Sequence, residues 1–224
     1  MISVVVPVLN EVRGLPATLA ALREQGDRHE TIVVDGGSDD GTVELLRSDP
    51  TLRVVESRRG RGPQMNAGAA IARGDVLIFL HADTRLPPGA IARLDAAAES
   101  DWQAGAFSHR FAPADWRLHA VSIGNNLRCR WSRIYFGDQA IFVRKALFER
   151  VGGFPEVPIL EDVIFCERLR PLTRSVLLGE TVVTDSRRFR HHGVWRTVWR
   201  GLWILARHRF GFAPGGEGYS DVVR

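Results

Sequence analysis

The chemically most informative segment of the chain is Phe79-Leu80-His81-Ala82-Asp83-Thr84. It follows an apolar strand expected at residues 76–80, and Pro87-Pro88 prevent that strand from continuing. Polar side chains two residues apart at the carboxyl end of such a strand can face one ligand. An imidazole with a carboxylate suits a divalent cation that keeps open positions for phosphate oxygens. The alternative is structural: Asp83 or Thr84 caps a helix that begins near Pro87.

Two further sets of polar residues follow strands expected at residues 2–8 and 31–35. Asn10 and Glu11 stand where a dinucleotide-binding protein carries GxGxxG, and the absence of those glycines argues against an NAD-dependent dehydrogenase. Asp35 ends the second strand before a glycine turn, so it is placed to accept hydrogen bonds from a ribose or a base. The alternative for Asn10 is that it only caps the next helix.

A basic loop and a carboxylate pair complete the candidate set. Arg58-Arg59-Gly60-Arg61-Gly62 precedes a helix expected near Pro63, and arginines with backbone amides at a helix start favour an anion. Glu161-Asp162 suit the removal of a proton from an attacking hydroxyl group. The alternatives are a solvated basic loop and an acidic helix start that the helix dipole favours.

Composition indicates a soluble globular protein. The chain has 224 residues, 45% of them hydrophobic and 25% charged, and its net charge is +4. Nearly all of its positively charged side chains are arginines, because Lys145 is the only lysine. This charge fits a sugar-nucleotide, an anionic membrane or nucleic acid. Cys129 and Cys166 lack CxxC spacing and are expected to be reduced thiols. The N-terminus is expected to be a strand and not a signal peptide, and no apolar run reaches the ~20 residues of a membrane span, so we expect a cytoplasmic protein.

The expected elements alternate in the first hundred residues, with nearly continuous apolar strands at 2–8, 31–35, 52–56 and 76–80 and helical patterns between them. This alternation predicts a doubly wound α/β sheet of Rossmann type. Later expected strands are 102–111, 139–143 and 176–184, and later helices are 116–131, 145–151 and 160–169. We expect one domain with a nucleotide-binding half (about 1–100), an acceptor half (about 101–192) and a C-terminal helix and tail (193–224).

The C-terminal segment predicts an amphipathic helix over residues 194–210. One stripe of it is apolar and includes Trp195, Trp199 and Trp203, and arginines lie near or opposite that stripe. A basic helix rich in tryptophan can lie in a membrane interface, at the inner face of the cell membrane. The commoner role, which we favour at this point, is packing against the core or against a second subunit.

The order of VVVPVLNE, VVDGGSDDGT, RGRGPQMNAGA, FLHADT and LED is similar to that of the family 2 glycosyltransferases of GT-A fold. Within them the chain resembles the small bacterial group described as radical-SAM/selenodomain-associated, or arsenosugar-biosynthesis-type, transferases. The resemblance covers roughly residues 1–190, and five motifs in the same order make it specific. It implies a mixed sheet with helices on both faces. It also implies inverting transfer of a sugar from a nucleotide-diphospho-sugar to an acceptor hydroxyl group, assisted by Mn²⁺ or Mg²⁺ and without nucleic acid.

The resemblance also assigns roles to residues. The nucleotide is expected to contact Pro7, Asn10, Glu11, Asp35, Arg61 and His81. Asp83 is the metal-bearing member of the DxD signature, whose first position is His81 here, and His191 is a further candidate for the metal shell. Asp162 is the expected base, with Glu161 orienting it or the acceptor. Donor sugar and acceptor are expected near Asp138 and Gln139.

Two other classes of protein compete with this hypothesis. A sugar-nucleotidyltransferase shares the α/β architecture, but such enzymes carry a glycine-rich loop with a basic catalytic residue where this chain has Asn10-Glu11. A non-catalytic, membrane-associated module that binds nucleotide-sugars has no reason to keep both Asp83 and Asp162. We therefore expect an active glycosyltransferase.

Overall fold

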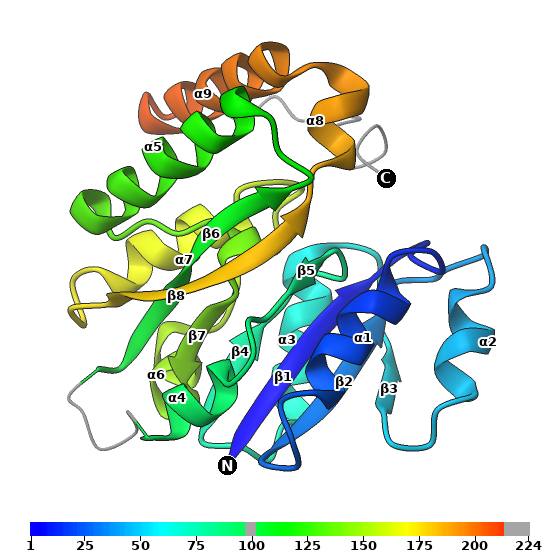
Figure 1. The fold of residues 1–224 in the computed structure, drawn as a ribbon. Coiled ribbons are helices and arrows are strands. Elements are labelled where there is room, and N and C mark those ends of the chain that lie inside the picture. The colour runs from blue at the N-terminus through cyan, green and yellow to red at the C-terminus, as the bar shows by residue number, and fades with distance from the viewer. Residues whose placement is uncertain (97–101, 213–224) are drawn as a thin grey trace.

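The computed structural model describes residues 1–96 and 102–212. In these ranges a mixed sheet of eight strands has helices on both faces, and its strand order is β3-β2-β1-β4-β7-β6-β8-β5 (Figure 1). The strands are β1 (Ile2–Val8), β2 (His29–Asp35), β3 (Arg53–Glu56), β4 (Val76–Phe79), β5 (Thr84–Arg85), β6 (Ala104–Ala112), β7 (Ile141–Arg144) and β8 (Val176–Asp185). The helices are α1 (Leu15–Arg23), α2 (Thr42–Arg47), α3 (Arg61–Ile71), α4 (Ala90–Ala96), α5 (Trp116–Ser132), α6 (Lys145–Val151), α7 (Glu161–Leu169), α8 (Arg187–His192) and α9 (Val194–Arg209).

The first half of the sheet is parallel, as its sequence predicts. Strands β2 and β4 pair with the two edges of β1, and β3 pairs with β2. All seven residues of β1 are buried, and alternate residues enter separate core clusters on the two faces of the sheet, which is why the strand is apolar throughout. Helix α3 packs so closely that a Cβ on Gly68 would lie 2.4 Å from Val5 Cγ1. Only glycine fits that position.

The second half joins the first through β7, which is antiparallel to both β4 and β6. Strand β8 runs parallel to β6, and its end pairs with the short strand β5. The Thr84 and Thr184 hydroxyls lie 2.9 Å apart, and the Asp185 amide donates to the Asp83 carbonyl at 3.0 Å. This pairing holds the loop after β4 against residues a hundred positions later in the chain.

The doubly wound sheet with helices on both faces is therefore confirmed, but two small elements were not predicted. Strand β5 has only two residues, and α8 forms between the strand expected at 176–184 and the helix expected at 194–210, where the sequence predicted no element. Helix α4 begins at Ala90, so neither Asp83 nor Thr84 caps it. Helix α1 has Gly14 at its N-cap, so Asn10 is not a cap either.

The C-terminal helix extends over Val194–Arg209, close to its predicted bounds, and residues 213–224 of the predicted tail lie outside the described residues. None of the helices in the described ranges combines the length and the hydropathy that crossing a bilayer requires.

Candidate active site

A pocket of about 520 Å³ lies where β1 and β4 end, and eight of the residues predicted from the sequence line it: Pro7, Glu11, Arg61, His81, Asp83, Asp138, Glu161 and Asp162. They come from the end of β1 and the loop after it, the loop after β4, the first residue of α3, the turn before β7 and the first turn of α7. The expected juxtaposition of Asp83 and Asp162 in one cavity is thus present. Four predicted residues do not line this pocket: Asn10, Asp35, Gln139 and His191.

Asn10 and Asp35 connect and shape the two loops beside the pocket. Asp35 is buried and accepts hydrogen bonds from the Gly37 amide at 2.9 Å and the Ser38 amide at 3.1 Å. The Asn10 side chain accepts from the Asp39 amide at 2.9 Å, and the Asn10 amide donates to Ser38 Oγ at 2.9 Å. These hydrogen bonds fix the shape of the two loops beside the pocket.

Glu11 ties the first loop to the C-terminal part of the chain. Both of its carboxylate oxygens accept from Arg187 Nη2 at 2.7 Å, and this guanidinium belongs to the first residue of α8. Such a charge-assisted contact is stronger than a hydrogen bond between neutral groups. Arg187 and Arg188 both line the pocket, so α8 brings two guanidinium groups to it. Burial, together with the nearby charge of Arg61, lowers the pKa of Arg188 to about 10.

Arg61 lies among the carboxylates of the pocket. Burial opposes its charge, but the carboxylates of Glu161, Asp162, Asp83 and Asp138 outweigh burial and raise the pKa of the guanidinium. Its Nη1 is 3.7 Å from Glu161 Oε1, and 41% of its side chain remains exposed. As the first residue of α3, it stands where unpaired helix amides also favour an anion.

Asp162 lies in the first turn of α7, and two backbone amides hold its side chain. Gly137 and Val163 each donate to its carboxylate at 2.7 Å. Burial and the adjacent Glu161 carboxylate outweigh these hydrogen bonds and raise the pKa of Asp162 to about 7. The preceding residue, Leu160, has φ of 65°, a left-handed conformation that is unusual for a bulky side chain. Such backbone strain is concentrated at functional sites.

Asp83 and His81 occupy different environments although they share one loop. Burial and the nearby Asp138 raise the pKa of Asp83, against the opposing charges of Arg187 and Arg61. Burial, with Arg61, lowers the pKa of His81 well below its usual value, so its imidazole is neutral. Its Nε2 is buried and has no hydrogen-bond partner among the described residues, and a Cβ on Gly137 would lie only 2.3 Å from it. The His81 ring therefore packs against Gly137, and its Nε2 does not face the open cavity.

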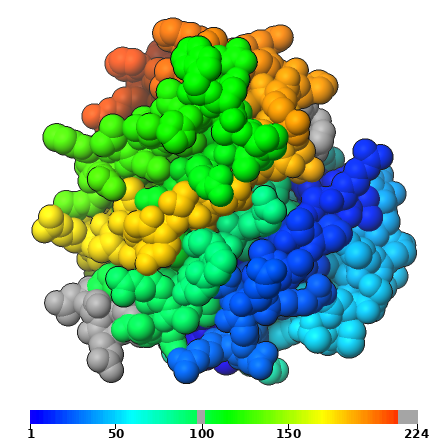
Figure 2. Space-filling model, in the orientation of Figure 1, coloured from blue at the N-terminus to red at the C-terminus, as the bar shows by residue number. Residues whose placement is uncertain are grey.

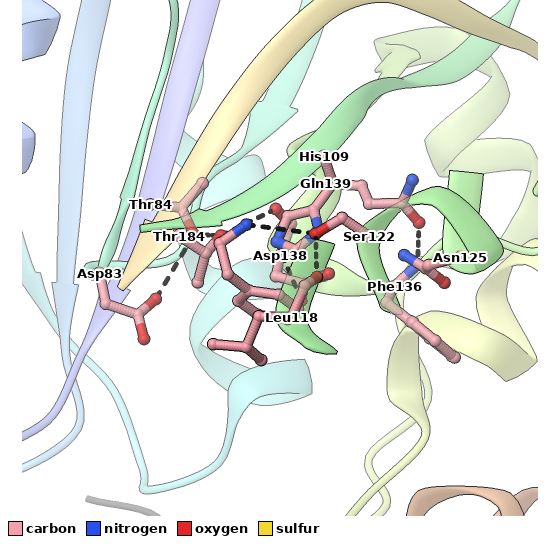
Figure 3. A network of polar contacts seen from close by, with 12 residues as sticks. Asp83, Thr84, His109, Leu118, Ser122, Asn125, Phe136, Asp138, Gln139 and Thr184 are labelled. Carbon is pink, nitrogen blue, oxygen red and sulfur yellow. Dashed lines mark hydrogen bonds and ion pairs between the residues drawn. The ribbon is translucent and has the colours of Figure 1, made fainter. Parts of the chain in front are cut away.

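Figure 3 shows the surroundings of Asp138 beside the Asp83 loop. Within residues 1–96 and 102–212, Asp138 Oδ1 is buried without a hydrogen-bond partner, and His109 Nε2 approaches its Oδ2 at 3.6 Å. His109 projects from β6, and both of its ring nitrogens are buried with no hydrogen-bond partner in the same ranges. Gln139 is fully buried, and its Oε1 accepts from the Phe136 amide at 3.1 Å. Gln139 thus shapes the turn beneath the pocket and has no surface on it.

The sequence did not single out His109 or the pocket-lining residue Arg128. Arg128 stacks on the Phe136 ring at 4.1 Å and donates to the Ile134 carbonyl at 3.0 Å. A histidine within the strand expected at residues 102–111 was the one available signal for His109. His191 is exposed, and its Nδ1 lies 3.4 Å from Nδ1 of His192, away from the pocket. That position does not support its predicted place in a metal shell.

The carboxylates that suit a divalent cation are Asp83 and Asp138. Asp83 accepts a 3.4 Å contact from the Thr84 hydroxyl, and 26% of the Asp138 side chain is exposed, so both carboxylates can offer oxygen atoms. No group of three His, Cys, Asp or Glu side chains arranged to hold an ion occurs in residues 1–96 and 102–212. The donor set therefore fits a cation whose remaining ligands are phosphate oxygens and water.

The solved structures to which the chain is similar share its fold. A mannosyltransferase from Pyrobaculum calidifontis, solved in complex with GDP-Man and Mn²⁺, aligns with TM-score 0.69 and 24% identity over 91% of this chain and 61% of that one. The S. aureus protein TarS 1-349 aligns with TM-score 0.65 and 21% identity over 84% of this chain and 61% of that one. The predicted GT-A fold is confirmed by these neighbours.

Curated relatives point the same way. An undecaprenyl-phosphate 4-deoxy-4-formamido-L-arabinose transferase of Aeromonas hydrophila is 33% identical over 64% of this chain and 48% of its own length. The protein with the same name in Shewanella sediminis is 34% identical over 72% and 54%. The chain thus spans about half the length of these relatives. These names favour a glycosyltransferase over a nucleotidyltransferase or a non-catalytic module.

The sequence profile of the family described as glycosyl transferase family 2 matches residues 3–154, which is more than half of the chain. This match covers the loops after β1, β2 and β4 and the basic loop before α3, all of which were predicted from the sequence to form the site. The chain therefore belongs to glycosyl transferase family 2.

Proposed function

We propose that this enzyme transfers a sugar from a nucleotide-diphospho-sugar to an acceptor hydroxyl group with inversion at the anomeric carbon. The observation that carries the proposal is a single pocket holding Asp162, whose pKa is about 7, together with the Asp83 and Arg61 side chains. A base that is half-ionised near neutral pH and a cationic group for the leaving diphosphate are the two requirements of this reaction.

In this proposal the donor lies against the loops after β1 and β4. Pro7 and Glu11 line the pocket beside the nucleotide, and Asn10 and Asp35 fix the shape of the neighbouring turns. The diphosphate lies near Arg61 and near the two arginines that begin α8. Three guanidinium groups aimed at one cavity stabilise the negative charge that grows on the departing diphosphate.

Asp83 and Asp138 are the residues that would hold Mn²⁺ or Mg²⁺. Bound with the donor phosphates, such a cation supplies charge neutralisation for the leaving group. The Pyrobaculum neighbour was solved with Mn²⁺, which supports a divalent cation in this fold. Membership of the radical-SAM-associated group remains a proposal that rests on the five motifs.

The chemical step uses Asp162 as the base. The acceptor oxygen attacks the anomeric carbon, the bond to the diphosphate breaks, and the hydroxyl proton moves to the Asp162 carboxylate. The amides of Gly137 and Val163 hold that carboxylate in one orientation. Glu161 lies beside Asp162 and near Arg61. Its carboxylate raises the pKa of Asp162 and holds the Arg61 guanidinium in place.

The test compares Asp162→Asn with Glu161→Gln. Asp162→Asn is expected to abolish transfer to a hydroxyl acceptor while nucleotide affinity, measured by calorimetry, stays within about twofold, since only the proton acceptor is lost. Glu161→Gln keeps the base and is expected to retain measurable turnover. Normal turnover in Asp162→Asn would contradict the assignment.

A second acceptor class is favoured by the relatives, whose names specify undecaprenyl phosphate. The pocket has a wall that includes Val121, Ile204 and Leu205, and Arg128 lines it as well, so a lipid-linked phosphate would find both apolar contacts and positive charge. A phosphate acceptor is already ionised at neutral pH and needs no base. The same Asp162→Asn variant therefore separates the two classes, because it would keep substantial transfer to a phosphate acceptor.

A further inference from the structure

Two helices at one end of the molecule present aromatic side chains to solvent. Helices α5 and α9 lie side by side there (Figure 1), and Figure 2 shows α5 on the surface with the α8–α9 segment beside it. Five of the six tryptophans are on these helices, with exposures of 73% for Trp116, 86% for Trp131, 49% for Trp195, 70% for Trp199 and 53% for Trp203. So many exposed tryptophans on one patch mark a surface that binds something.

The exposed side chains form one stripe on each helix. Helix α5 exposes Trp116, Ile123, Leu127 and Trp131, and α9 exposes Trp195, Trp199, Leu202 and Trp203. Spacings of three, four and seven residues place each set on a single helix face. The Trp116 and Trp195 rings are 6.5 Å apart, so the two stripes adjoin. We call these eight residues the aromatic surface.

The charge of the two helices is entirely positive. Neither α5 nor α9 contains an aspartate or glutamate, and together they carry seven arginines: Arg117, Arg128, Arg130, Arg196, Arg200, Arg207 and Arg209. Some of these arginines also have partners within the protein, such as Arg117 with Asp115 and Arg128 with Asn125. Tryptophan mixed with arginine is the composition of segments that lie at a membrane interface.

The same two helices form a wall of the active-site pocket. Val121, Asn125 and Arg128 of α5 and Gly201, Ile204 and Leu205 of α9 line it. Leu202 lines the pocket and is also 50% exposed, so pocket and aromatic surface meet at this residue. A substrate could therefore pass between the aromatic surface and the pocket over a short path.

We propose that the aromatic surface of α5 and α9 docks onto an anionic lipid bilayer and turns the adjoining wall of the pocket toward the membrane. The tryptophans would enter the interface between headgroups and acyl chains, and the arginines would contact lipid phosphates. A second copy of the chain is disfavoured as the occupant, because a symmetric contact would bring two sets of arginines together without one acidic residue on either helix.

The experiment is flotation with vesicles of phosphatidylcholine alone or with added phosphatidylglycerol. We expect the whole protein to float with the anionic vesicles at low salt and to be released by high salt or neutral vesicles. Trp199→Ala with Trp203→Ala should reduce flotation, and Arg196→Gln with Arg209→Gln should reduce the partition coefficient about fivefold per arginine. Leu172→Ala and Arg47→Gln, which change exposed residues on other elements, are the matched controls.

A second measurement needs no substitution. Because the remaining tryptophan, Trp102, is buried at 6% exposure, native tryptophan fluorescence reports mainly on the aromatic surface. Brominated anionic lipids should quench it. Absence of flotation and quenching in the unaltered protein would overturn the proposal, as would equal flotation of all variants. A dimer in light scattering that dissociates in the tryptophan double variant, without flotation, would assign the surface to a second copy instead.

This proposal does not depend on the reaction. Flotation is measured without donor or acceptor, whereas the proposed function is tested by donor binding and by turnover of the Asp162 variant. The two can therefore fail separately.

Discussion

Asp162 gives the site a pH dependence that can be measured directly. Its pKa of about 7 arises from burial and from the neighbouring Glu161. Because the ionised form accepts the proton, kcat/KM should rise with pH up to about 7 and level off above it. Glu161→Gln removes one of the two causes, so the rising limb should move to lower pH. A flat profile from about pH 5.5 to 8 would contradict the role of Asp162 as the base.

His109 is expected to position Asp138. The two side chains approach to 3.6 Å within a buried region, and Asp138 Oδ1 has no hydrogen-bond partner. His109→Phe keeps an aromatic ring beside Phe111, which lies 4.4 Å from the imidazole centroid, but removes both nitrogens. We expect thermal stability to change little and kcat to fall about tenfold, with a weaker dependence on divalent cation. A variant with unchanged kcat would assign His109 to packing alone.

At the residue scale the sequence predicted the carboxylates of the pocket better than the residues that surround and position them. Asp83 and Asp162 stand in short motifs next to strand and helix ends, and such positions converge at one sheet edge. Residue type alone does not reveal the direction of a side chain, so Gln139 was expected on the pocket and lies beneath it. His109 and Arg128 reach the site only through the packing of β6 and α5, which no local pattern encodes.

Among the elements, the turn at Gly137–Gln139 controls two parts of the site. The Gly137 amide donates to Asp162 at 2.7 Å, and the His81 ring fills the space where a Cβ would lie 2.3 Å from its Nε2. Gly137→Ala should therefore displace His81 or the turn, destabilise the fold by about 1–3 kcal/mol and lower turnover far more than nucleotide affinity.

Gly124→Ala is the matched control for this substitution. Gly124 also lines the pocket, from the middle of α5, but an added Cβ would have nothing within 4 Å. It should leave turnover nearly unchanged and raise stability by about 0.5–1 kcal/mol, because alanine favours a helix over glycine. Equal loss of turnover in both variants would refute the specific role of the turn at Gly137.

Elements that a local sequence pattern specifies were predicted well, whereas an element that depends on a distant partner was not. The nearly continuous apolar runs of β1, β2 and β4 identify strands of a buried parallel sheet, and their predicted bounds were within two residues of those found. Strand β5 consists of Thr84 and Arg85 and exists only because β8, a hundred residues later, pairs with it. A local sequence pattern carries no signal for such a strand.

At the scale of the whole molecule, the pocket joins the two halves of the chain. Glu11 and Asp83 come from the first hundred residues, whereas Asp138, Asp162 and Arg187 come from the later part. The Glu11–Arg187 ion pair and the Thr84–Thr184 contact connect these parts beside the cavity. A ligand that contacts both parts should therefore stabilise the folded chain as a unit.

This coupling predicts a cation-dependent thermal shift. A nucleotide-diphospho-sugar with Mn²⁺ at about a hundred times its Kd should add about 2.7 kcal/mol to the free energy of unfolding, a rise of several degrees in Tm. Asp83→Asn should remove the part of the shift that depends on Mn²⁺, because it removes a carboxylate from the candidate cation site. Asp75→Asn, which changes a side chain that is 81% exposed and absent from the pocket lining, should leave the shift intact. A shift that is the same with Mn²⁺ and with EDTA would show that Arg61 and the α8 arginines hold the diphosphate without a cation.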